Sequence, residues 1–70
     1  MMPLNLATTG EAYSVKRIGG KPEVRQHLEE MGFTEGTEIN VISSVNGCVI
    51  VKVRESRVAI NQEMAGKIMI

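Results

Sequence analysis

Alternating apolar and polar residues along most of the chain predict a series of short β-strands. The five predicted strands are Glu11–Ile18, Glu38–Ser44, Val49–Arg54, Arg57–Asn61 and Lys67–Ile70. The first strand alternates imperfectly, because its apolar residues Val15 and Ile18 would point to opposite faces of a straight strand. We therefore expect a bend or bulge near Lys16 and Arg17.

One helix of about three turns is predicted between the first two strands, with a proline at its first position. Its apolar stripe consists of Val24, Leu28 and Met31, which are spaced i, i+4 and i+7. Gly32 follows this stripe and is typical of a left-handed helix stop. We expect a Schellman ending, in which the next residue, Phe33, packs against Leu28.

Two further turns are predicted from polar residues and glycines. Thr34–Thr37 fits a type II turn, in which Gly36 supplies the positive φ at the third position. Asn61 is expected to cap a single helical turn, Gln62–Ala65, which Gly66 closes before the last strand.

The hairpin around Asn46 and Gly47 has two possible registers. A two-residue type I′ turn is the usual interpretation of Asn-Gly, but it would place the apolar residues of the two strands on opposite faces. A three-residue loop, Val45–Gly47, instead pairs Ser43 with Val49, Val41 with Val51 and Ile39 with Val53. We therefore predict the three-residue loop, which keeps the apolar residues on one face.

The next hairpin, with a turn at Glu55-Ser56, is predicted to pair Val53 with Val58 and Val51 with Ile60. The two hairpins then share one apolar face, made of Ile39, Val41, Val49, Val51, Val53, Val58 and Ile60. Three strands curled over this face and closed by the first and last strands predict an all-β fold, a small five-stranded β-barrel. The helix would cap one open end of this barrel.

The composition is that of one small domain covering residues 1–70. Eight basic and eight acidic residues balance, which argues against nucleic-acid binding, since that usually requires a basic surface. A single cysteine, Cys48, excludes an intramolecular disulfide and fits a reducing compartment. No signal peptide is visible, and the longest apolar run, Cys48–Val51, is too short to insert into a membrane. We therefore expect a cytoplasmic protein.

With these elements the chain resembles the FeoA family, small cytosolic proteins of bacterial ferrous-iron uptake that have an SH3-like barrel. The core of the resemblance is Leu28–Phe33, followed by Gly36 and Thr37 and by the alternating strand Val49–Val53. Other positions that match the family pattern are Leu6, Gly10, Val15, Ile18–Gly20, Arg25–Phe33, Ala65, Ile68 and Ile70. The resemblance covers nearly the whole chain.

The resemblance implies a non-enzymatic accessory protein that binds the cytosolic domain of a ferrous-iron transporter, an FeoB-like membrane protein. The residues agree, because Gly19-Gly20-Lys21 lacks the spaced glycine and the hydroxyl residue of a phosphate loop, and no positioned nucleophile is visible. The family domain is also fused to some metal-dependent repressors. Two alternatives are therefore a regulatory domain working with a metal-dependent transcription factor and a small transition-metal-binding protein.

The candidate metal ligands are Glu23, His27 and Glu30, which share one face of the predicted helix. The two glutamates are about 10 Å apart along the helix axis, so both do not readily reach one ion together with His27. Three protein ligands are the usual minimum for a zinc site. We therefore expect no cofactor, and at most weak binding of Fe²⁺ or Zn²⁺.

Two surface regions are candidates for binding a partner protein. The first, named the basic edge, consists of Lys16, Arg17, Lys21 and Arg25. It would engage an acidic cytosolic surface. The second is the hairpin tip, where an exposed Val45 beside Asn46 would offer an apolar anchor. We prefer the basic edge, because it adjoins the helix that distinguishes this barrel from a bare one.

Overall fold

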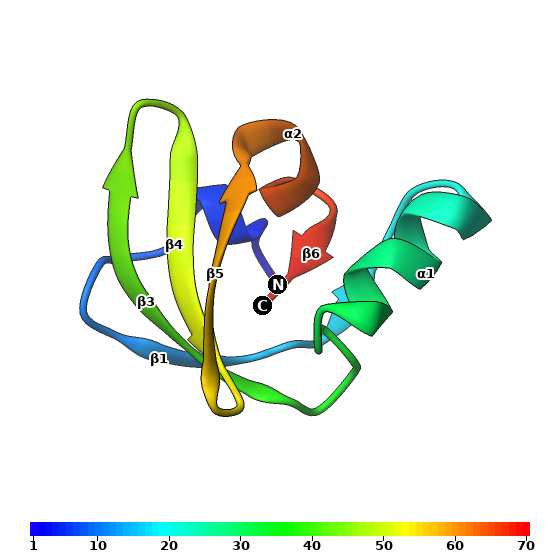
Figure 1. Cartoon of the computed structure of the whole chain (residues 1–70), viewed down its shortest axis with the longest axis horizontal. Coiled ribbons are helices and arrows are strands. Elements are labelled where there is room, and N and C mark those ends of the chain that lie inside the picture. Colours follow the sequence, from blue (N-terminus) through cyan, green and yellow to red (C-terminus); the bar gives the residue numbers. More distant parts are fainter.

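The computed structural model describes all 70 residues of the chain, Met1–Ile70. The helical segments are η1 (Leu4–Leu6), α1 (Pro22–Glu30) and α2 (Gln62–Ala65). The strands are β1 (Ala12–Ser14), β2 (Arg17–Ile18), β3 (Glu38–Val45), β4 (Cys48–Val53), β5 (Ser56–Asn61) and β6 (Ile68–Met69). One antiparallel sheet has the strand order β1-β3-β4-β5, and β2 pairs with β6 in a second sheet. Figure 1 shows the larger sheet curving around the interior, with the chain ends inside the curve and α1 at the flank.

The predicted first strand is divided into β1 and β2 by a bend at Val15 and Lys16. Before the bend β1 pairs with β3, and the Val15 N–H donates to the carbonyl oxygen of Thr37 at 2.9 Å. After the bend the Lys16 N–H donates to the carbonyl oxygen of Met69 at 2.7 Å, and β2 pairs with β6. The expected bend is confirmed. It carries the chain from one sheet to the other, which lets β2 and β6 close the barrel.

Helix α1 ends as predicted. The N–H of Phe33 donates to the carbonyl oxygen of Leu28, and the N–H of Gly32 donates to that of Glu29, each at 3.0 Å. Gly32 has a φ of +106°, and both Leu28 and Phe33 are fully buried in the core, so the Schellman motif is complete. Leu28 is the one α1 residue that is fully buried, and the other two residues of the stripe are half-buried beside it.

The predicted type II turn and the predicted helical turn after Asn61 are also confirmed. Gly36 has a φ of +86°, and the Thr37 N–H donates to the carbonyl oxygen of Thr34 at 3.0 Å, as in a type II turn. The side chain of Asn61 accepts a hydrogen bond from the Met64 N–H at 2.8 Å and so caps α2.

The first hairpin shows that the predicted three-residue loop is wrong. β3 and β4 are joined by the two residues Asn46 and Gly47, whose φ angles are +49° and +78°. Val45 and Cys48 form the pair that closes this turn. Asparagine and glycine are the residues that best tolerate a positive φ, so the local turn preference decides the loop length.

A β-bulge in β3 restores the common apolar face. The register shifts between Val41 and Ser43, so that Ser43 pairs with Ile50 and not, as predicted, with Val49. Beyond the bulge the predicted pairs are confirmed, namely Val41 with Val51 and Ile39 with Val53. The extra residue in β3 moves the side chains that follow it to the opposite face of the sheet. The chain thereby keeps both its preferred turn and its apolar inner face.

In the second hairpin, β4–β5, the side chains point to the predicted faces, but the residues pair in a different register. Its turn is Arg54 and Glu55, so Val53 pairs with Ser56 and the predicted pair of Val53 with Val58 is wrong. The displacement is two residues, which leaves each side chain on its predicted face because the period of a strand is two. The observed register gives all six residues of β4 a partner in β5. The predicted register would leave the first two residues of β4 unpaired.

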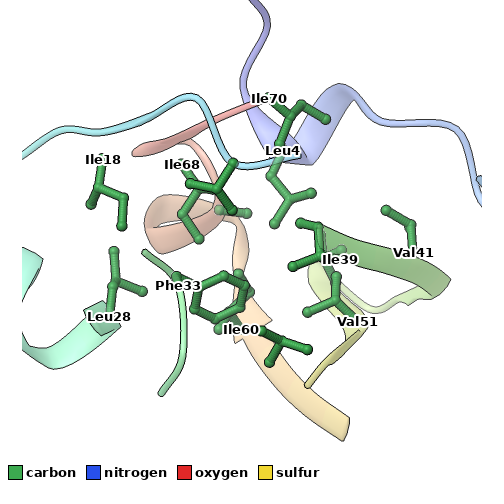
Figure 2. Packing of buried hydrophobic residues seen from close by; sticks show 14 residues of the cluster. Leu4, Ile18, Leu28, Phe33, Ile39, Val41, Val51, Ile60, Ile68 and Ile70 are labelled. Carbon is green, nitrogen blue, oxygen red and sulfur yellow. The ribbon is translucent and has the colours of Figure 1, made fainter. Parts of the chain in front are cut away.

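A single cluster of buried apolar residues fills the barrel. Its members are Leu4, Val15, Ile18, Leu28, Phe33, Ile39, Val41, Val49, Val51, Val53, Ile60, Ala65, Ile68 and Ile70. Figure 2 shows side chains from the strands, from α1 and from the chain ends gathered around Phe33. The seven-residue apolar face predicted from the strands is therefore the wall of this core, with Val58 half-buried at its edge.

Both ends of the chain take part in closing the barrel. The Met2 N–H donates to the carbonyl oxygen of Ile70 at 3.0 Å, and the Ile70 N–H donates to that of Met2 at 2.8 Å. This pairing holds Leu4 in the core with 1% of its surface exposed, whereas Leu6 is 66% exposed. The sequence predicted the last strand, but not its pairing with the first residues.

Candidate interaction surfaces

The basic edge lies along the bend, β2 and the beginning of α1. Lys16 is at the bend and Arg17 is in β2. Lys21 is the N-cap residue of α1, and Arg25 follows in the first part of that helix. All four residues are exposed. The segment that joins β2 to α1 runs along the side of the barrel on which α1 lies (Figure 1).

Lys67 joins the basic edge, although sequence reasoning did not include it. The Gly19 N–H donates to the carbonyl oxygen of Lys67 at 2.7 Å, which places the start of β6 beside the end of β2. The aliphatic stem of Lys67 lies over Gly20, since a Cβ at Gly20 would be 2.9 Å from the Lys67 Cδ. The prediction that the first and last strands close the barrel was the available signal, but it did not pair these strands with each other.

The hairpin tip is a separate surface. Val45 is 50% exposed, as predicted, and Asn46 next to it forms the turn. Figure 1 shows the β3–β4 hairpin and α1 on opposite sides of the molecule. The structure therefore does not bring the hairpin tip and the basic edge together into one site.

The candidate metal ligands Glu23, His27 and Glu30 are all exposed on α1. No group of three or more histidine, cysteine, aspartate or glutamate side chains lies close enough together to hold a metal ion. Cys48 is a free, half-buried thiol at the start of β4. The structure thus does not assemble a metal-binding group from the predicted residues.

The remaining surface has no enclosed site. No pocket opens on it, and no buried side-chain nitrogen or oxygen atom lacks a hydrogen-bond partner. None of the helices has the length and the apolarity that crossing a membrane requires. What the surface does present is exposed charge, the apolar side chains of Met1, Leu6 and Val45, and the edges of two small sheets.

Comparison with known proteins places the whole chain in one family. The family model described as FeoA domain matches residues 2–70. The chain belongs to the FeoA family. A relative from Methanocaldococcus jannaschii named "Putative Fe(2+) transport protein A" is 39% identical over 70 residues, which are 100% of this chain and 85% of the relative. A crystal structure of an iron uptake regulatory protein (FeoA) matches with a TM-score of 0.87 at 36% identity, over 96% of this chain and 89% of that one.

Two more distant structures support the fold alone. Stenotrophomonas maltophilia FeoA complexed with zinc, described as a prokaryotic SH3 domain protein, has a TM-score of 0.84 at 21% identity, over 99% of this chain and 88% of that one. A manganese-dependent transcriptional repressor has a TM-score of 0.85 at 19% identity, over 94% of this chain and 38% of the repressor. The predicted SH3-like barrel and the resemblance to the FeoA family are confirmed.

Proposed function

We propose that this protein is a non-enzymatic, cytoplasmic accessory protein of a ferrous-iron transporter, and that it acts by binding the cytosolic domain of that transporter, an FeoB-like membrane protein. The observation that carries the proposal is the 39% identity, over the whole chain, to a relative named for Fe(2+) transport. The family match over residues 2–70 supports the same role.

The basic edge is the proposed contact with the transporter. Lys67 brings a fifth cation to it, and the first turn of α1 contains one acidic residue, Glu23. Lys21 caps α1 without a side-chain hydrogen bond to the helix. The start of a helix carries a partial positive charge, which adds to the field of the side chains, although in α1 the Val24 and Arg25 N–H groups donate to the Lys21 carbonyl oxygen. An acidic surface on the cytosolic domain is the complement of this edge.

Reversing two charges of the basic edge is expected to weaken transporter binding. The double variant Arg17→Glu, Arg25→Glu should bind the purified cytosolic domain about tenfold less tightly, if each reversal costs about 0.7 kcal/mol, within the range for exposed ion pairs. The loss should shrink at high salt, because exposed charges are screened beyond about 8–10 Å at physiological ionic strength. Biolayer interferometry at two salt concentrations measures both effects.

The matched control is the double variant Arg17→Lys, Arg25→Lys, which keeps both charges and should bind nearly as well as the unchanged protein. Both double variants should keep the melting temperature, since the two side chains are exposed. Unchanged binding by the reversal variant, together with loss of binding in Val45→Glu, would move the contact to the hairpin tip. Unchanged binding in all of these variants would place the contact outside both surfaces, and absence of binding by the unchanged protein would show that the transporter is not the partner.

Metal binding by α1 is the alternative that a titration tests. We expect isothermal titration with Zn²⁺ or Fe²⁺ to show at most weak binding, and His27→Ala to leave the curve unchanged, because exposed ligands on one helix do not form the usual three-ligand site. Gln26→Ala, on the same helix, is the control for loss of helix structure. Tight binding of one ion per chain that His27→Ala abolishes would favour the metal-binding function instead.

The role beside a metal-dependent transcription factor rests on the likeness of fold to part of a repressor chain. Affinity capture from the source cell separates it from the transporter role. Recovery of a membrane transporter supports the proposed function, and recovery of a DNA-binding protein contradicts it.

A further inference from the structure

The outer edge of β5 is unpaired. β5 pairs with β4 alone, so the larger sheet ends at this strand. Val53 and Ser56 close a two-residue turn and therefore form a hydrogen-bonded pair, after which every second residue of β5 points its N–H and C=O groups towards β4. The N–H and C=O groups of Arg57 and Ala59 thus point outward, and both residues are exposed. An edge of this kind can accept a further strand.

The side chains at this edge favour an acidic partner. Arg57 lies directly opposite Lys52 in the ladder, and both residues are exposed. Like charges at such a position repel each other. The side-chain hydrogen bonds of the chain involve Tyr13, two threonines and Asn61, so neither cation donates one. A carboxylate on an added strand would offset the repulsion between these two cations.

The other face of the same strand favours apolar residues in the partner. Val58 and Ile60 point to the interior, and Val58 is half-buried where the sheet ends. A strand laid along β5 would continue this inner face, and an apolar side chain beside Val58 would cover its exposed part. On the outer face Ala59 pairs with the half-buried Ile50, which leaves room for a side chain next to the alanine.

We propose that the edge of β5 binds an extended segment of a partner protein by strand addition, with a carboxylate against Arg57 and Lys52 and with apolar side chains beside Val58. A second copy of this chain that pairs through its own β5 is a poorer occupant. Its β5 strand, Ser56–Asn61, contains no acidic residue and would add another arginine to the sheet. This surface is distinct from the basic edge, so the inference does not rest on the proposed function.

The test uses a synthetic eight-residue peptide that alternates valine with threonine and carries one central glutamate on the threonine face, and a twin with glutamine at that place. In an NMR titration the glutamate peptide should shift the amide signals of Arg57 and Ala59 and slow their hydrogen exchange. The twin should bind roughly two- to fivefold more weakly, which is the range for one exposed ion pair. Absence of these amide changes at millimolar peptide overturns the proposal.

Two variants make the test specific for the edge. Ala59→Pro removes an outward N–H and no bond to β4, so peptide binding should be lost while the spectrum of the fold is retained. Ala59→Ser keeps the N–H and should bind as before. Arg57→Glu places a carboxylate opposite Lys52 and neutralises the pair, so the preference for the glutamate peptide over its glutamine twin should be lost.

Three results would contradict strand addition at this edge. They are binding that persists in a folded Ala59→Pro variant, an unchanged peptide preference in Arg57→Glu, and sedimentation showing a dimer that Ala59→Pro dissociates, which would make a second copy the occupant. If Ala59→Pro does not fold, the peptide preference of Arg57→Glu alone tests strand addition at this edge.

Discussion

Replacing Phe33 with alanine should unfold most of the protein. Phe33 is 0% exposed and is the one aromatic residue of the core, where α1 ends and the side chains of the strands and the chain ends meet (Figure 2). Emptying a buried phenylalanine site costs about 3–5 kcal/mol. A core of this size supplies about 3–5 kcal/mol of net stability, so the loss is comparable to the whole. Denaturant unfolding followed by circular dichroism measures it.

The chain offers a matched aromatic control in Tyr13. That residue is half-buried at the edge of the core, and its hydroxyl accepts a hydrogen bond from the Thr8 N–H at 2.9 Å. Tyr13→Ala should therefore keep a cooperative transition and lose less stability than Phe33→Ala. An unchanged denaturant midpoint for Phe33→Ala would contradict the central place of Phe33 in the core.

Features determined by a few neighbouring residues could be predicted from the sequence. The Schellman ending at Gly32, the type II turn at Gly36 and the cap at Asn61 each depend on one residue whose backbone or side chain suits the position. The faces of the strands were also predicted correctly, since burial alone determines them. Local chemistry and the apolar pattern agree at all of these places.

The register of the hairpins could not be predicted in the same way, because two preferences competed. Asn46 and Gly47 favour a two-residue turn, whereas the apolar pattern of β3 and β4 requires the other parity. The chain satisfies both preferences with a bulge between Val41 and Ser43. No residue at that place is of a type that would predict a bulge. In the second hairpin, a slip of two residues changes no face, so the pattern could not distinguish the registers.

The candidate surfaces divide along similar lines. The four predicted residues of the basic edge lie within ten positions of one another, so the sequence could group them. Lys67 joins them through the pairing of β2 with β6, which links distant parts of the chain. The open edge of β5 depends on the order of strands in the sheet. A surface produced by topology requires the structure.

Replacing Gly32 with valine should be the next most harmful change. Its φ of +106° lies outside the range that a β-branched residue adopts, and such backbone strain costs roughly 1–3 kcal/mol. A Cβ would also lie 3.3 Å from Cγ2 of the buried Val53 and 3.4 Å from Nε of Arg54. Displacing a core side chain adds roughly 1–3 kcal/mol. Urea unfolding of the purified variant measures the sum.

Gly36 separates the two contributions, because it shares the backbone requirement without the crowding. Its φ is +86°, and a Cβ there would meet nothing within 4 Å. Gly36→Val should therefore lose only the backbone part, and the difference between the two variants gives the contribution of the close approach of Gly32 to Val53 and Arg54. Equal losses would show that this approach contributes nothing to stability. A Gly32→Val variant as stable as the unchanged protein would show that α1 does not need its left-handed ending.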